Sequence, residues 1–121
     1  MTARSVSLCP VPLWEQLARD DETATFFQTP AWLRLGSRWS GRDAEIASLL
    51  FEFPDGPACL PLLRDRRWGR PRYFSPFGTY AAIVCPRALG PVETGVIESA
   101  LRRLNLLLVS SPFARNVVRA G

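Results

Sequence analysis

The chain has 121 residues, of which 47% are hydrophobic and 21% charged, so it can bury the core of one globular domain. It contains no histidine and no lysine, and its formal net charge of +4 comes entirely from arginine. These absences exclude serine–histidine and cysteine–histidine nucleophile systems, lysine Schiff bases, a phosphate-loop lysine and histidine metal ligands.

The first third of the chain predicts a short strand followed by two helices. Ser5–Leu8 has strand character, and Pro12 suits the first turn of a helix. Thr29 and Pro30 have the N-cap and first-turn character that begins a second helix, which Gly41 ends. Two groups of apolar residues are predicted to be core: Leu13, Trp14, Leu17 and Ala18, then Phe26, Phe27, Trp32, Leu35 and Trp39. For the second group, an aromatic platform that binds a ligand is the alternative.

The middle of the chain predicts a β-hairpin. Glu45–Phe53 alternates apolar and polar residues, and Ala58–Leu63 returns after a turn of proline, aspartate and glycine. Pro61 lies inside the returning strand and cannot donate to a ladder, so we expect an edge or a bulge there. The apolar segment Tyr80–Cys85 predicts a third strand.

The last third predicts a helix, a strand and the start of another helix. Pro86–Val92 predicts a tight turn into the helix, whose apolar stripe consists of Val96, Ile97, Ala100, Leu101 and Leu104. Leu106–Val109 reads as a buried strand, and Ser110–Pro112 as a helix cap. The whole order favours an α/β fold, with a mixed, partly antiparallel sheet and helices on both faces.

The three cysteines and the N-terminus bear on the cellular compartment. Cys9, Cys59 and Cys85 show no Cys-x-x-Cys pairing, and we interpret them as buried thiols in a reducing compartment. No apolar stretch has the length of a signal peptide or of a membrane span. The expected location is the cytoplasm.

The excess positive charge is concentrated in one segment, Arg64–Arg72, which we interpret as a loop. It holds five arginines and one acid, whereas the other residues carry equal numbers of arginines and acids. Aromatic residues follow it directly. One interpretation is a solvated loop that keeps a sheet edge soluble, and the other is an anion-binding groove.

Three segments of the chain resemble the FemAB-like branch of the GNAT-type N-acetyltransferase fold. Ala24–Trp32 is similar to that family's "fFqTpaW" helix entry, Leu60–Leu62 to the end of its second hairpin strand, and Ser75–Tyr80 to its "sp…tYgg" segment. The resemblance covers about residues 24–112. It implies that 1–121 is a single GNAT-like domain, incomplete at its C-terminus and lacking a second such domain.

The resemblance also implies a function. FemAB-like proteins transfer amino acids or acyl groups in cell-wall and surface-polysaccharide synthesis, so this chain would be the substrate-binding portion of such an enzyme. The donor in the full protein would be acyl-CoA or aminoacyl-tRNA. The acceptor would be a phosphate-bearing sugar or lipid-linked precursor, bound by arginine forks and the turn beside them. The candidate substrate-binding residues are Arg70, Arg72, Ser75 and Tyr80. No catalytic residue and no metal ligand is assigned.

A second candidate phosphate site lies before the last predicted helix. The coenzyme A loop of the wider family reads R/Q-x-x-G-x-G/A, and here Arg87 and Gly90 match it while Pro91 does not. Proline removes one amide that would point at a phosphate, so an ordinary glycine cap is the alternative.

Two other functions remain open from the sequence. Arginines interleaved with Trp68, Tyr73 and Phe74 are also typical of a nucleic-acid-binding module. The balanced charge elsewhere argues against a long polyanion track. An inactive half-domain with an interaction role is the third interpretation.

Overall fold

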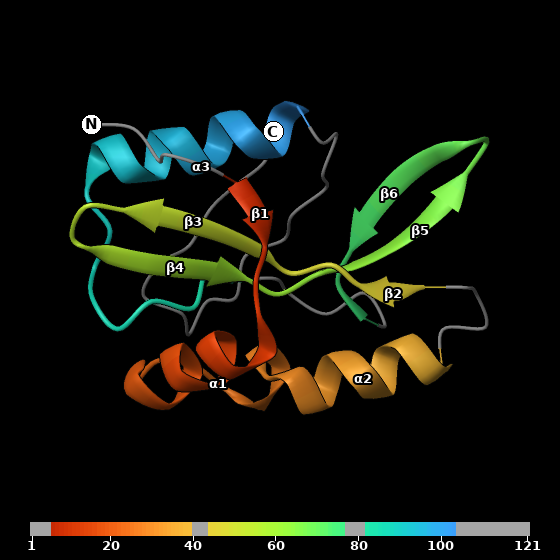
Figure 1. The fold of residues 1–121 in the computed structure, drawn as a ribbon, viewed down its shortest axis with the longest axis horizontal. Helices are drawn as coiled ribbons and strands as arrows, with labels where there is room; N and C mark the ends of the chain where they lie inside the picture. Colours follow the sequence, from red (N-terminus) through yellow and green to blue (C-terminus); the bar gives the residue numbers. More distant parts are fainter. Residues whose placement is uncertain (1–5, 40–43, 77–81, 104–121) are drawn as a thin grey trace.

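The computed structural model describes residues 6–39, 44–76 and 82–103, which form a mixed α/β fold (Figure 1). In this part of the chain, three α-helices and a short 3₁₀ turn pack around two three-stranded antiparallel sheets. The α/β class is confirmed, but the strands divide into two sheets where the sequence predicted one. The elements are β1 (Val6–Leu8), α1 (Val11–Asp20), η1 (Phe26–Gln28), α2 (Pro30–Trp39), β2 (Glu45–Ile46), β3 (Leu49–Phe53), β4 (Gly56–Leu60), β5 (Leu63–Arg67), β6 (Arg70–Phe74) and α3 (Pro91–Arg103).

The segment between α1 and α2 is held by its own polar side chains. Thr25 Oγ1 accepts a hydrogen bond from the Phe27 amide at 3.3 Å, and Gln28 Oε1 accepts one from the Thr25 amide at 2.7 Å. This is a capping box, which satisfies two amides at the start of η1. The buried Trp14 indole donates to the Gln28 carbonyl at 2.7 Å and so ties α1 to this segment.

Both predicted helix starts are confirmed. Pro12 lies in the first turn of α1, where its missing amide would have no helical partner anyway. Thr29 precedes α2, and its Oγ1 accepts a hydrogen bond from the Trp32 amide at 3.4 Å. The sequence therefore identified the right residue types at both helix starts.

The predicted β-hairpin is also confirmed. β3 and β4 pair antiparallel, from Leu49 opposite Leu60 to Phe53 opposite Gly56. Gly56 has a φ of 129°, which residues with a side chain rarely adopt. β1 pairs antiparallel with the other edge of β3.

Both strands of this hairpin bend at the same level and continue into the second sheet. Residues 47–48 and 61–62 leave the regular ladder, and beyond them β2 pairs with β5. The Leu62 amide donates to the Ser48 hydroxyl at 3.2 Å. At the bend, a side-chain oxygen therefore replaces a backbone carbonyl as the acceptor for this amide. Of the edge or bulge expected at Pro61, the structure shows neither: Pro61 lies in an interruption of the ladder with two residues on each strand, whereas a bulge needs an extra residue on one of them.

The prediction of a loop at Arg64–Arg72 was wrong, because most of this segment forms a second β-hairpin. β5 and β6 pair antiparallel along their whole length. Trp68 and Gly69 form the turn with φ values of 57° and 76°, and positive φ at both central residues is the mark of a type I′ turn. The sequence hid this hairpin because its strands are built from arginines instead of alternating apolar residues.

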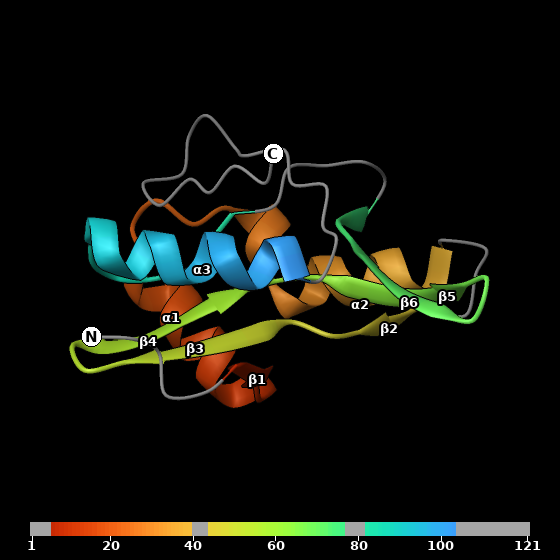
Figure 2. The ribbon, with the colours of Figure 1, turned by 90° about the horizontal axis from the view of Figure 1, so that it is seen from above.

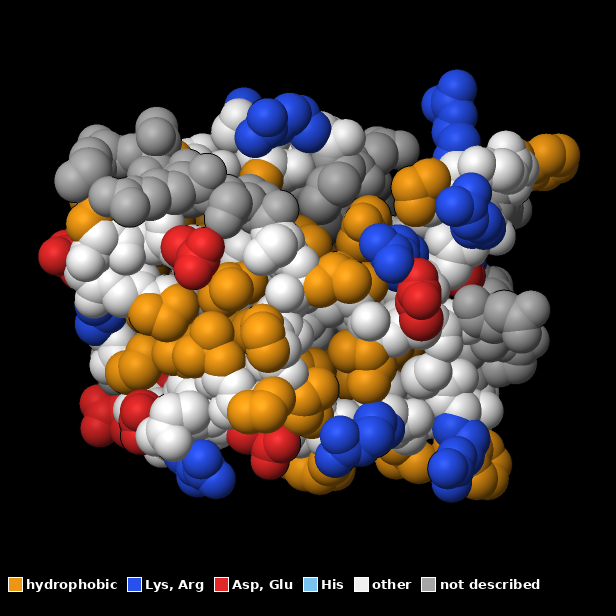
Figure 3. Space-filling view, in the orientation of Figure 1, with side chains coloured by type: hydrophobic (Ala, Val, Ile, Leu, Met, Phe, Trp, Pro, Cys, Tyr) orange, Lys and Arg blue, Asp and Glu red, His pale blue; other side chains and the backbone are white. Residues whose placement is uncertain are grey.

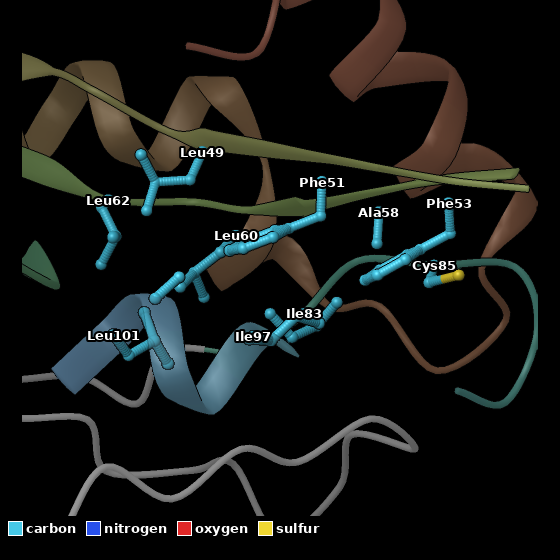
Figure 4. Close-up of a cluster of buried hydrophobic side chains, with 11 residues drawn as sticks. Leu49, Phe51, Phe53, Ala58, Leu60, Leu62, Ile83, Cys85, Ile97 and Leu101 are labelled. Atoms are coloured by element: carbon cyan, nitrogen blue, oxygen red, sulfur yellow. The ribbon is translucent and has the colours of Figure 1, made fainter. Parts of the chain in front are cut away.

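Two hydrophobic cores lie on opposite faces of the β1–β3–β4 sheet, with α3 over one and α1 and α2 over the other (Figures 1 and 2). Figure 4 shows the side chains of β3 and β4 that point toward α3. β4 contributes to both cores, since Ala58 and Leu60 face α3 while Cys59 faces Trp14. The α3 core contains Leu49, Phe51, Phe53, Ala58, Leu60, Leu62, Ile83, Cys85, Ile97, Ala100 and Leu101.

The core prediction was wrong for part of the second aromatic group. Phe26, Phe27, Leu35 and Trp39 are 55%, 48%, 41% and 69% exposed. They lie on the outer side of η1 and α2, whose buried side carries Leu33. Helical spacing placed these residues on a common face but could not tell which face the sheet would cover.

The remaining predictions concern the cysteines, the third strand and the end of the chain. Cys59 and Cys85 are buried free thiols as expected, whereas Cys9 is only half-buried. Within the expected strand Tyr80–Cys85, the described residues form a single antiparallel bridge between Val84 and Cys59. The strand and helix predicted after residue 103, and Gly41, lie outside the described residues. None of the helices in the described ranges combines the length and apolar character needed to cross a membrane.

Candidate functional site

The arginine segment forms a two-stranded ribbon that projects from the body of the protein (Figure 1). Residues directly opposite one another in an antiparallel pair share a face. Arg64 lies opposite Tyr73, and Asp65 lies opposite Arg72. The arginines are therefore divided between two faces of the ribbon and do not form one continuous cluster.

Arg64 is held at the base of the ribbon. Its Nε and Nη2 donate to Glu45 Oε1 at 2.8 and 2.5 Å, and its Nη1 donates to the Tyr73 hydroxyl at 3.3 Å. Hydrogen bonding to Tyr73, and then to Glu45, raises the pKa of Arg64. These contacts fix β2, β5 and β6 to one another and occupy most of the donors of this guanidinium.

Arg72 is held in the same way by a buried acid. Its Nε donates to Asp65 Oδ1 at 3.0 Å and its Nη2 to Asp65 Oδ2 at 2.7 Å. The Asp65 side chain is 5% exposed, and the guanidinium lies 5.6 Å from the centre of the Phe74 ring. Two hydrogen-bond donors of Arg72 are already bound to the Asp65 carboxylate. Arg72 therefore stiffens the ribbon and has fewer donors available for a ligand.

The tip of the ribbon differs from its base. Arg66 and Arg70 are exposed, and neither belongs to an ion pair with a described residue, although Arg66 Nη1 donates to the Gly69 carbonyl at 3.4 Å. Trp68, at the turn, is 89% exposed. Figure 3 shows arginine and hydrophobic side chains projecting over this hairpin. The sequence pointed to Trp68 only for the nucleic-acid alternative and did not single out Arg66, because only the hairpin turn reveals that they share the tip with Arg70.

The structure brings only some of the predicted substrate-binding residues together. Arg70 and Arg72 lie on one face of β6, and Ser75, half-buried, follows this strand directly. Tyr80 lies outside the described residues. The assignment of these four residues to substrate binding stays a prediction.

The second candidate phosphate site is filled by an internal carboxylate. Arg87 donates to both carboxylate oxygens of Glu93, at 2.8 and 2.5 Å, and the Gly90 amide donates to Glu93 Oε1 at 3.0 Å. Hydrogen bonding to Arg87 lowers the pKa of Glu93, and the same contact raises the pKa of Arg87. Glu93 thus takes the two donors that the resemblance assigned to a phosphate, as a capping acid in the first turn of α3 does.

The two candidate anion sites lie at opposite ends of the molecule. Arg87 Nη2 also donates to the Gly56 carbonyl at 3.3 Å, which places Arg87 beside the β3–β4 turn. That turn and the Trp68–Gly69 turn lie at opposite ends in Figures 1 and 2. A single small ligand therefore cannot bridge them.

An open groove of about 330 Å³ lies between α1 and the start of α2. Glu15, Arg19, Thr29 and Arg34 contribute its polar lining. Arg19 Nη2 donates to Gln16 Oε1 at 3.0 Å, so its guanidinium is partly engaged within α1. Sequence analysis did not single out this groove, because it forms only when the two helices pack together. The described residues contain no group of three or more side chains suited to hold a metal ion.

No protein-family model, no curated protein and no solved structure matches this chain.

Proposed function

We propose that this chain is the substrate-binding portion of a FemAB-like acyl- or aminoacyltransferase that acts in cell-wall or surface-polysaccharide synthesis. Its role is to hold the acceptor, a phosphate-bearing sugar or lipid-linked precursor. The donor, acyl-CoA or aminoacyl-tRNA, is bound mainly by the second GNAT-like domain that the resemblance implies.

The observation that carries the proposal is the order of the strands. β1, β3, β4 and the segment around Val84 lie side by side and antiparallel in this order, with α1 and α2 on one face and α3 on the other. For the first part of a GNAT-like domain, the resemblance implies two helices followed by a three-stranded meander and then a strand, a turn and a helix. The capped segment at Thr25–Gln28 adds support, since it lies within Ala24–Trp32, one of the three segments that carry the resemblance.

The proposed acceptor site is the exposed end of the arginine ribbon. Arg70 is the principal phosphate ligand, because its guanidinium is exposed and its planar fork matches two phosphate oxygens. Arg72 has a positioning role, since its ion pair with Asp65 keeps β5 and β6 aligned beneath the ligand. Transfer to an amine then depends on placing the acceptor beside an activated donor, which requires no general base from this chain.

The geometry at the start of α3 supports leaving the donor to the second domain. Glu93 already accepts hydrogen bonds from Arg87 and Gly90. A donor pyrophosphate would have to displace this carboxylate, at the cost of its ion pair.

The test is calorimetric titration of the full chain with a uridine-diphosphate-linked amino sugar. Replacing Arg70 with glutamine should weaken binding about tenfold or more, because a charge-assisted hydrogen bond contributes about 1.5–3 kcal/mol. Arg103→Gln is the control, since it makes the same change in charge on exposed α3. An affinity that Arg70→Gln and Arg103→Gln reduce equally would refute the acceptor site.

A further inference from the structure

The turn residue Trp68 is costly for the folded chain in two ways. Its side chain is 89% exposed, so this large indole contributes almost no hydrophobic stabilisation to the described fold. Its φ of 57° lies in the left-handed region, where bulky residues are rare and where type I′ turns favour asparagine. An exposed aromatic residue held in a strained conformation points to a partner outside the chain.

A second exposed tryptophan lies at the same end of the molecule. α2 ends at Trp39, which is 69% exposed and follows Arg38. The end of α2 and the tip of the β5–β6 hairpin both lie at this end in the two perpendicular views of Figures 1 and 2. Two exposed indoles, each with an arginine nearby in the sequence, are therefore carried by separate elements that end on the same side of the molecule.

The positive charge at this end lies on Arg66 and Arg70 at the tip and on Arg38 beside Trp39. Arg66 and Arg70 are exposed, and residues 66–74 contain no acid. Arg64 and Arg72, which could have extended a phosphate track along the ribbon, are occupied by Glu45 and Asp65. The free cations thus suit a local contact with an anionic plane better than the long groove that a nucleic-acid strand requires.

We propose that this end of the molecule docks on an anionic lipid surface. Trp68 and Trp39 enter the interfacial layer, where indole rings are favoured, while Arg66 and Arg70 bind lipid phosphates. A lipid surface is continuous, so it accommodates two indoles on separate elements without any fixed spacing between binding sites. The proposal shares Arg70 with the proposed acceptor site, but vesicles without any sugar precursor test lipid binding separately from the transferase role.

The experiment is co-sedimentation of the full chain with vesicles of phosphatidylcholine and phosphatidylglycerol, compared with vesicles of phosphatidylcholine alone. The chain should bind the anionic vesicles more strongly. Replacing Arg66 and Arg70 together with glutamine should weaken binding about 25-fold, because each arginine near an anionic surface contributes about fivefold. The control variant changes Arg102 and Arg103 of α3 to glutamine, with the same loss of charge.

The decisive variant is Trp68→Asn. It creates the Asn-Gly pair that type I′ turns favour, so the hairpin keeps its fold while it loses the indole. We expect an unchanged or higher melting temperature. We also expect vesicle binding to be weaker by up to roughly tenfold. Phe26→Ala, which removes an exposed aromatic side chain on η1, should leave binding unchanged.

Three results would overturn the proposal. The first is equal binding of Trp68→Asn and the parent chain to anionic vesicles. The second is equal loss of binding in the α3 control and in the tip variant. The third is no vesicle binding together with binding of a single-stranded oligonucleotide that depends on Arg66 and Trp68, which would assign the tip to nucleic acid.

Discussion

Arg70 and Arg72 lie two residues apart on β6, yet their surroundings give them different roles. Arg72 makes two hydrogen bonds to the buried carboxylate of Asp65, whereas Arg70 is exposed and has no ion pair with a described residue. The sequence placed both in one cluster because it shows charge density and not cross-strand partners. Asp65 was visible as the only acid of the segment, but its register opposite Arg72 depends on where the chain turns.

This difference predicts unequal effects of the two arginines on the free energy of unfolding. Arg72→Gln should lower the free energy of unfolding by about 1–3 kcal/mol, because it takes two charge-assisted hydrogen bonds from a buried acid. Arg70→Gln should change it by less than about 0.5 kcal/mol, as exposed substitutions usually do. Urea unfolding of the two variants checks this, and equal losses would contradict the distinct roles.

Glu93 makes the contribution of the α3 start to protein stability dependent on pH. The contact with Arg87 lowers the pKa of this carboxyl below its ordinary value of 4.5, so the folded state holds the charged form more strongly than the unfolded state. The resulting stability is present above about pH 4.5 and is lost as the pH falls through the lowered pKa of the folded state.

The variant Glu93→Gln should therefore be less stable than the parent near neutral pH, by about 1 kcal/mol for a partly exposed pair at a helix start. The difference between the two proteins should shrink as the pH is lowered below about 4.5, as measured by thermal unfolding across the acid range. A difference that does not change with pH would mean that the ion pair contributes nothing to stability.

At the scale of elements, Gly36 allows α2 to pack closely against Pro76, which follows β6. A Cβ built on Gly36 would lie 2.6 Å from Pro76 Cγ and 3.4 Å from Leu63 Cδ1. The proline ring is fixed to its backbone and cannot swing away. The sequence shows Gly36 only as a weak helix residue, because the close approach to Pro76 arises from packing between distant segments.

Gly36→Ala should destabilise the protein by about 1–3 kcal/mol through overpacking, although alanine favours helices. Gly95→Ala in α3 provides the comparison, since no atom lies within 4 Å of its added Cβ. This variant should gain about 0.5–1 kcal/mol from helix propensity. Chemical denaturation of both variants measures the contrast, and stabilisation by Gly36→Ala would show that α2 can move away from β6.

The two hairpins show which elements a sequence reveals. The β3–β4 hairpin was predictable because Leu49, Phe51 and Phe53 alternate and an Asp-Gly turn follows. The β5–β6 hairpin has neither signal. Arginines and the cross-strand ion pair between Asp65 and Arg72 replace apolar alternation, and Trp68 occupies a turn position where asparagine or aspartate would have marked it.

At the scale of the whole molecule, the two cores are coupled through β4. The successive residues Cys59 and Leu60 point to opposite faces, Cys59 toward α1 and Leu60 toward α3. Neither core can therefore open without disturbing the same strand. The sequence predicted helices on both faces from the element order. It could not predict that one strand would serve both cores, since this depends on the register between β3 and β4.

This coupling predicts that a change in one core is felt in the other. Ile97→Ala leaves a cavity in the α3 core and should lower the free energy of unfolding by about 2–4 kcal/mol. Tryptophan fluorescence, to which buried Trp14 of the opposite core contributes, should report the same shifted transition as far-UV circular dichroism. Two separate transitions would show that the cores unfold independently.

The shared bend at residues 47–48 and 61–62 constrains how this chain can vary in evolution. β3–β4 and β2–β5 are two parts of one continuous ribbon, and successive side chains of a strand point to opposite faces. Deletion of one residue from either arm would invert every side chain beyond it, exchanging the faces of Arg64 and Asp65 at the projecting end. Natural insertions and deletions should therefore be found at the exposed turn residues Pro54 and Asp55, while the spacing from Gly56 to Trp68 stays constant.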